Sequence, residues 1–199
     1  MKLIITATLV TVATFAMLMA TSALAISDPT PNTIGIYLDT EADEMCVDGL
    51  TEAMTEFTMH MILTNPTFDT MHGFLAGYHF EGVAQLNSAV LAHANATDSG
   101  GLGDHIVNFD SPVPTSTIMP LMTITATYVD FEYGPAVLQL HGIILAALTG
   151  NVPAAILDGN ELFDLHLSFD DGSTVRINAG CNPVANESLS FDGIKSLYR

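Results

Sequence analysis

The sequence predicts an all-β fold, an antiparallel β-sandwich of about nine short strands. Apolar and polar residues alternate with a period of two, which places every second side chain on the same face of a strand. The alternating runs are short and rich in Thr, Ile, Val, Phe and Tyr, which suit a half-buried pleated surface. Turn-forming residues separate the runs, and no long stretch has the period of an amphipathic helix. These three observations together indicate two packed sheets.

Five strands are predicted in the first half of the chain. Thr33–Asp39 has Ile or Leu at every even position. Glu56–Thr64 has Phe, Met, Met and Leu at successive odd positions, and Gly73–Phe80 has Phe, Ala, Tyr and Phe at successive even positions. Val83–Ala92 and His105–Asp110 alternate less regularly. Each run therefore has one face suited to the core of a sandwich.

Four strands are predicted in the second half. Leu121–Val129 alternates throughout, with three Thr residues on one face and Met, Ile, Ala and Tyr on the other. Val137–His141, Leu162–Ser168 and Thr174–Asn178 show the same pattern. The turn Asp170-Asp171-Gly172 between the last two runs predicts a hairpin.

Other turn signals punctuate the chain, and two segments are ambiguous. Residues 40–53 indicate a loop or a short helix, and the apolar run Ile143–Leu148 is compatible with a helical turn. The turn signals are Asn65–Thr67, Asp98–Gly101, Pro112–Pro114, Tyr133–Pro135 and Asp158–Asn160.

Residues 1–25 are interpreted as a secretory signal peptide. Lys2 provides the positive start, an uncharged apolar run follows, and Ala23-Leu24-Ala25 forms a small-x-small cleavage site. The alternative is a membrane anchor, since the run is about long enough to span a bilayer. Cleavage predicts an exported protein, periplasmic or extracellular, with a β-sandwich domain at 26–182 and a C-terminal tail at 183–199.

The protein is strongly acidic, with 22 Asp and Glu against 4 Lys and Arg. The chain after residue 25 keeps only Arg176, Lys195 and Arg199, so its net charge is 3 − 22 = −19. Nucleic-acid binding needs a basic surface that displaces counterions, and anionic membranes repel such a chain. Both functions are excluded; the charge indicates cationic partners, a salty medium or simply solubility. We expect no membrane span after signal cleavage.

The two cysteines, Cys46 and Cys181, are predicted to form a disulfide, because an exported chain meets an oxidising environment. The bond would close a loop of about 135 residues, which corresponds to roughly 4–5 kcal/mol in the chain-entropy model. The alternatives are two free thiols or half of a metal site. Neither cysteine has a His or another Cys within four residues, which disfavours the metal site.

Several short motifs resemble a group of uncharacterised exported bacterial proteins. Ile34–Asp39 (IGIYLD) is followed seven residues later by Cys46, and Leu63–Thr67 (LTNPT) ends a predicted strand. Val175–Asn178 (VRIN) precedes Cys181, and the chain ends in Gly193–Arg199 (GIKSLYR). The resemblance implies a secreted β-sandwich of immunoglobulin-like or cohesin-like type, and it implies no catalytic residue.

An acidic segment is the best candidate for a metal site. Asp39, Glu41, Asp43 and Glu44 fall within six residues, and Ca²⁺ takes six to eight oxygens from such groups. The spacing does not match an EF-hand loop. A solvated acidic face is the alternative, and no other cofactor is expected.

Seven histidines and a methionine cluster raise the question of transition metals. A zinc hydrolase needs three converging ligands, and the HExxH motif is absent. Strand parity places Met59 and Met61 on the same face and His60 on the other, which favours core packing over copper ligation. His72 and His79 have opposite parity, so a continuous strand would point them apart. The histidines are His60, His72, His79, His93, His105, His141 and His166.

No catalytic residue is predicted, since the GxSxG elbow and a P-loop lysine are both missing. We expect a non-enzymatic exported module for binding, adhesion or surface structure, with an unknown protein or glycan ligand. A metal-dependent hydrolase on a β-sandwich and a calcium-stabilised adhesion domain are the alternatives. In the tail, Phe191, Ile194 and Leu197 recur every three residues and predict a short helical segment that docks on the domain or a partner subunit.

Overall fold

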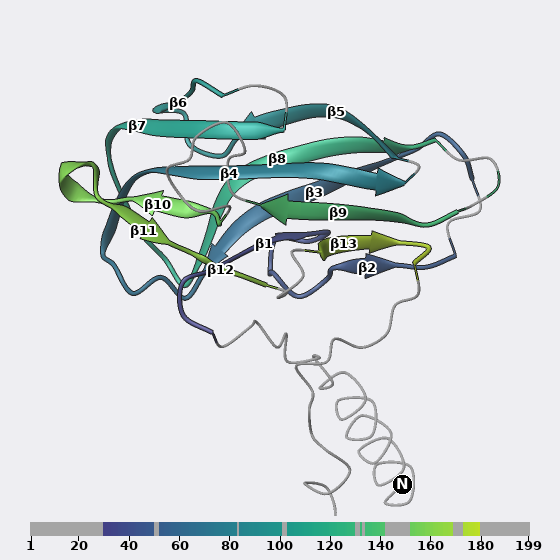
Figure 1. Cartoon of the computed structure of the whole chain (residues 1–199), viewed down its shortest axis with the longest axis horizontal. Helices are drawn as coiled ribbons and strands as arrows, with labels where there is room; N and C mark the ends of the chain where they lie inside the picture. Colours follow the sequence, from purple (N-terminus) through teal and green to yellow (C-terminus); the bar gives the residue numbers. More distant parts are fainter. Residues whose placement is uncertain are drawn as a thin grey trace, which may run out of the picture.

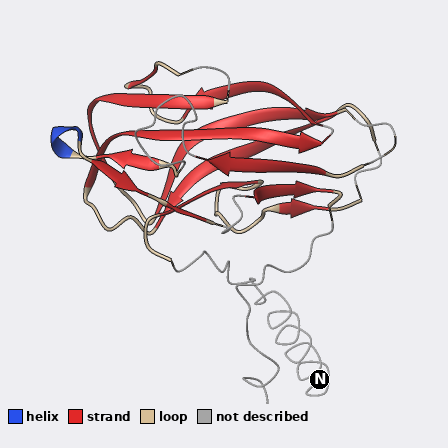
Figure 2. Cartoon of the chain, viewed as in Figure 1, coloured by secondary structure: helices blue, strands red, loops and turns tan. Residues whose placement is uncertain are grey.

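The computed structural model describes residues 30–49, 52–82, 84–100, 103–129, 132, 134–141, 152–168 and 173–179. In these ranges the chain forms thirteen strands and one short 3-10 turn, η1 (Asp158–Asn160). Figure 2 shows that strands dominate this part of the molecule. The all-β prediction is therefore confirmed.

Two sheets stack as layers (Figure 1). The first has the order β12-β1-β3-β8-β5. Its members are β1 (Thr33–Tyr37), β3 (Thr55–Thr64), β5 (Ala84–Leu91), β8 (Ile118–Tyr128) and β12 (His166–Leu167). The long central strands β3 and β8 pair antiparallel over ten residue partners, so they organise this layer.

The second sheet has the order β11-β10-β4-β9-β13-β2, and β7 adds to β4 and carries β6 on its far side. The 13-residue strand β4 is its centre, because it pairs with β7, β9 and β10. Its members are β2 (Cys46–Val47), β4 (Thr70–Gly82), β6 (Ala96–Asp98), β7 (Asp104–Pro114), β9 (Ala136–His141), β10 (Ala154–Ile156), β11 (Leu162–Asp164) and β13 (Ser173–Ile177).

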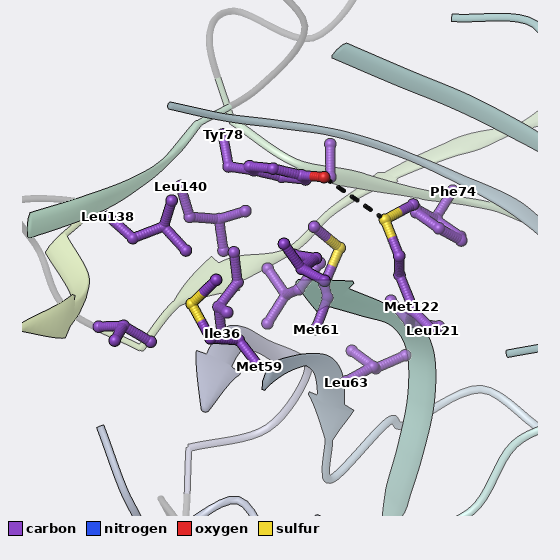
Figure 3. Packing of buried hydrophobic residues seen from close by; sticks show 14 of the residues in the cluster. Ile36, Met59, Met61, Leu63, Phe74, Tyr78, Leu121, Met122, Leu138 and Leu140 are labelled. Atoms are coloured by element: carbon purple, nitrogen blue, oxygen red, sulfur yellow. Dashed lines mark hydrogen bonds between the residues drawn. The ribbon is translucent and has the colours of Figure 1, made fainter. Parts of the chain in front are cut away.

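The core lies between the sheets and uses the faces that alternation predicts. Met59 and Met61 of β3 are fully buried, as are Phe74 of β4 and Ile124 of β8. Figure 3 shows Tyr78 in the same cluster as Met61 and Phe74. Its hydroxyl donates a hydrogen bond to Met122 Sδ, with an oxygen–sulfur distance of 3.9 Å. Methionine side chains fill irregular gaps well, which explains their use here.

The expectation of a purely antiparallel sandwich is wrong at two places. Strand β1 pairs parallel with β12, and β13 pairs parallel with β2. Both pairs are short, with two residue partners each. They join segments far apart in the sequence, so local alternation carries no information about their direction.

The run Leu162–Ser168 is not one strand. It divides at buried Leu165 into β11 and β12, which belong to different sheets. The Leu165 N–H donates to the Pro153 carbonyl, so the chain changes partners there. The predicted hairpin around Asp170–Gly172 is also wrong, because β12 pairs with β1 whereas β13 pairs with β9 and β2.

Three strands were not predicted because they are too short to show alternation. They are β2, which lies inside the expected loop or helix at 40–53, and the three-residue strands β6 and β10. Pro112–Pro114, expected as a turn, forms the end of β7. Pro112 lies where the register with β4 shifts between Met71 and Gly73, so no ladder N–H is needed there.

Several predictions fall on residues outside the described ranges. These are the signal peptide at 1–25, the apolar run at 143–148, Cys181 and the tail at 183–199. Within the described ranges, no helix has the length and apolar character needed to cross a membrane.

Candidate functional site

The acidic loop, residues 39–44, follows β1 and lies against the outer face of the first sheet. Its centre is Ala42, which is buried with Tyr37 and Ile62 although it has a positive φ of 64°. The loop is closed by a hydrogen bond of 2.6 Å from the Leu38 N–H to the Glu44 carbonyl. A small apolar anchor therefore holds a segment whose carboxylates reach solvent.

The carboxylates of this loop interact strongly with one another. The Asp43 N–H donates to Asp39 Oδ1 at 3.2 Å. The pKa of Asp43 is raised from 3.8 to about 6, first by a side-chain hydrogen bond with Asp39 and then by desolvation. The charges of Asp39, Glu41 and Glu44 raise it further. The raised pKa of Asp43 thus shows that the other three acids lie close enough to affect its charge.

We expect Asp43→Asn to raise the melting temperature at pH 7.5 by about 1–2 °C, because it removes a charge that Asp39, Glu41 and Glu44 repel. The increase is small, since an exposed charge interaction contributes less than about 1 kcal/mol. A raised pKa means that the folded state binds the proton more tightly than the unfolded state. The contribution of Asp43 to stability therefore increases as the pH falls through about 6. The gain from Asn should shrink towards pH 5.

Melting curves between pH 5 and 8 test this expectation. Asp110→Asn is the matched control, because Asp110 is an exposed aspartate outside the acidic loop. A Tm difference between Asp43→Asn and the native protein that stays constant with pH would contradict it.

Calcium binding at Asp39, Glu41, Asp43 and Glu44 stays a prediction. Among the described residues, no group of three or more His, Cys, Asp and Glu is arranged to hold a metal ion. If calcium binds here, a chelator-treated sample should release or absorb heat on titration with Ca²⁺ and melt at a higher temperature. Titration of a variant carrying Asp39→Asn and Asp43→Asn is the control, and an identical heat with that variant would place the ion elsewhere.

The structure also contains a polar pair, a buried histidine and a partly exposed aspartate, that the sequence did not indicate. His105 of β7 contacts Asp98 of β6 through Nδ1 and Oδ2 at 2.6 Å, and its side chain is only 7% exposed. The other carboxylate oxygen accepts hydrogen bonds from the N–H groups of Gly100 and Ile106, at 2.9 and 3.1 Å. Asp98 thus ties together both arms of the β6–β7 hairpin.

Tyr78 of β4 completes this cluster. Its ring stacks on the His105 imidazole, with centroids 5.2 Å apart and planes inclined by 21°. Burial raises the pKa of the Tyr78 hydroxyl, and the negative charge of Asp98 adds to the shift. The Tyr78 hydroxyl therefore stays protonated and donates to Met122.

An Asp–His pair resembles the arrangement that orients a general base. Here, however, His105 Nε2 is buried and has no hydrogen-bond partner among the described residues. Among those residues the pair contacts no nucleophile, and its contacts link β6 with β7 and the turn between them. The alternation of His105, Val107 and Phe109 contained the signal that His105 faces the core.

The other histidines with described side chains have separate surroundings. His72 contacts Asp158 at 2.6 Å, His79 lies 3.9 Å from Glu81, and His93 contacts the Pro120 carbonyl at 3.1 Å. His60 lies beside Thr123 on β8, and His166 is exposed on β12. The parity argument for His72 and His79 assumed a continuous strand, and the register shift between Met71 and Gly73 interrupts it.

The disulfide also stays a prediction, because Cys181 lies outside the described residues. Cys46 is on β2, which pairs with β13 through Cys46↔Arg176 and Val47↔Ile177. In the sequence, Cys181 follows Ile177, the last residue of β13, by four residues. No described cysteine is free.

No family model and no characterised protein sequence matches the chain. The structure is similar to a cohesin module from a Clostridium perfringens family 33 glycoside hydrolase, with a TM-score of 0.50 and 13% identity. The match covers 75% of this chain and 98% of that module. A type II cohesin domain from the cellulosome of Acetivibrio cellulolyticus matches with a TM-score of 0.47 and 10% identity, covering 75% of this chain and 96% of that domain. At this identity, the first likeness shows the β-sandwich fold alone.

Proposed function

We propose that this chain is an exported, non-enzymatic β-sandwich module that acts by binding a protein or a glycan, in adhesion or in surface structure. The observation that carries the proposal is that reactive side chains are buried in the fold. His105 is buried against Asp98 and Tyr78, and Met59 and Met61 fill the core. These three side chains, which would suit catalysis or soft-metal binding, therefore serve the fold.

The fold supports the same proposal by analogy. The C. perfringens neighbour is a module of a glycoside hydrolase, and it is named as a cohesin. A β-sandwich that forms one part of a larger assembly acts through its surface, which fits the solvated acidic loop of this chain. The net charge, −18 for the full chain, favours a partner with a cationic surface, because opposite charges accelerate encounter and favour correct orientation.

Capture of secreted proteins and glycans on the immobilised protein tests this function. The matched variant carries Asp39→Asn, Glu41→Gln and Glu44→Gln, which keep the shape of the acidic loop and remove three charges. We expect a partner that binds the native protein more tightly than the variant, with the difference reduced at high salt. Retention of no partner under any salt condition would argue against the proposal.

A metal-dependent hydrolase on the sandwich is the second function to test. Elemental analysis of the purified protein distinguishes it from the binding module. We expect no stoichiometric zinc, manganese or iron. One equivalent of such a metal that resists dialysis would favour the hydrolase.

A further inference from the structure

Among the strands that the structure describes, β5 is an open edge of the first sheet. It pairs with β8 on one side and is the last strand in the order β12-β1-β3-β8-β5. Half of its N–H and C=O groups therefore point away from the sheet, as they do in any edge strand. Figure 1 shows β5 at the upper rim of this layer.

The edge is accessible from several directions. Asn87, Ser88, Ala89 and Val90 are exposed one after another, so neither face of the strand is covered at this point. Val90 is 62% exposed and is one of the three large apolar side chains that stand out to solvent in the described part of the chain. Backbone groups and an apolar side chain are thus presented together.

In the described part of the chain, the last strands at the other sheet edges are shorter than β5. Edge strands β2 and β12 have two residues each, whereas β6 and β11 have three. β5 has eight residues, with one register shift between Leu86 and Ser88. Ser88–Leu91 after this shift is a regular edge segment without Pro, Lys or any other charged residue, the usual devices that block pairing.

The surface beside β5 is almost uncharged although the protein is strongly acidic. The polar face consists of the side chains of β3, β8 and β5 that point away from the core. Its members are Glu56, Thr58, His60, Thr123, Thr125, Thr127, Gln85, Asn87, Ser88 and Val90, and only Glu56 carries a formal charge. Two copies of this chain repel least when they approach through such a region.

We propose that two copies of this chain associate through β5, which pairs antiparallel with β5 of the second copy. A two-fold axis makes this edge self-complementary, because each outward N–H meets an outward C=O of the partner. The two five-stranded sheets then form one continuous sheet. A cationic partner has no electrostatic reason to choose this neutral edge, which is why the second copy fits it better.

Sedimentation equilibrium of the purified full chain, from low micromolar to submillimolar concentration, tests the proposal. We expect a monomer–dimer equilibrium that strengthens with salt, because salt screens the repulsion between two acidic copies. Val90→Lys should weaken dimerisation by about tenfold or more, since it places like charges near each other across the edge. Met54→Lys is the matched control, because Met54 is 63% exposed and precedes β3, two strands away.

Hydrogen exchange adds a readout that is specific to the edge. Amides of residues 84–91 should gain protection as the protein concentration rises. Val90→Lys should abolish the gain and leave the melting temperature unchanged at concentrations too low for the dimer to form. A monomer at every concentration would overturn the proposal. So would a dimer that Val90→Lys leaves intact, or one that forms without added protection in β5.

Discussion

Reduction of the disulfide that we predict between Cys46 and Cys181 should lower the free energy of unfolding by about 4–5 kcal/mol. The bond closes a loop of about 135 residues, and opening it restores conformational freedom to the unfolded chain. The bond would also link β2, the two-residue strand beside β13, to the residue four positions after Ile177. A strand this short has few hydrogen bonds of its own, so the link should matter for this corner of the sandwich.

Urea unfolding with and without reductant measures this effect. The double variant Cys46→Ser, Cys181→Ser should unfold like the reduced protein and should not respond to reductant, which makes it the control. Thiol titration under denaturing conditions should detect no free thiol before reduction and two afterwards. Two free thiols in the untreated protein, or an unchanged urea midpoint after reduction, would contradict the prediction.

Phe74→Ala should lower the free energy of unfolding by about 3–5 kcal/mol. Phe74 is fully buried on β4, the strand that pairs with β7, β9 and β10. The centroid of its ring lies 6.4 Å from the centroid of the Phe109 ring. Removal of the ring leaves a cavity in the middle of the core, which neighbouring strands cannot fill by small shifts.

Phe163→Ala is the matched control for this substitution. Phe163 lies on β11, is 36% exposed and contacts Phe68, with ring centroids 5.6 Å apart. Its loss should cost about 1 kcal/mol. Equal destabilisation by the two substitutions in urea unfolding would mean that the core does not lie where the structure puts it.

The long strands could be predicted because each has one buried and one solvated face. On β3 the odd positions from Phe57 to Leu63 pack inwards, and on β4 the even positions from Phe74 to Phe80 do the same. Alternation reports this difference directly. The all-β class and these two faces therefore followed from local pattern alone.

Features that depend on distant partners could not be predicted. The split of Leu162–Ser168 into β11 and β12 arises because one half pairs with β10 and the other with β1. The parallel pairing of β2 with β13 likewise joins segments about 130 residues apart. Both halves look like ordinary strand residues in sequence, since partner choice is decided by the topology of the whole sandwich.

In the candidate site, too, local features could be predicted from sequence and contacts between distant residues could not. The acidic loop was visible in sequence because its four acids are close along the chain. Its apolar anchor was not, since Ala42 meets Ile62 only after folding. The Asp98–His105 pair was hidden in part because its residues lie on opposite sides of a glycine-rich turn.

A turnover assay on the metal-reconstituted protein tests the central interpretation most directly. Chromogenic ester, phosphodiester and glycoside substrates are offered after incubation with Zn²⁺, Mn²⁺ or Ca²⁺. If the reactive side chains are engaged in holding the sandwich together, the rates should equal those of the metal ions alone. A saturable rate that depends on the protein and disappears on chelation would contradict that interpretation and identify an enzyme.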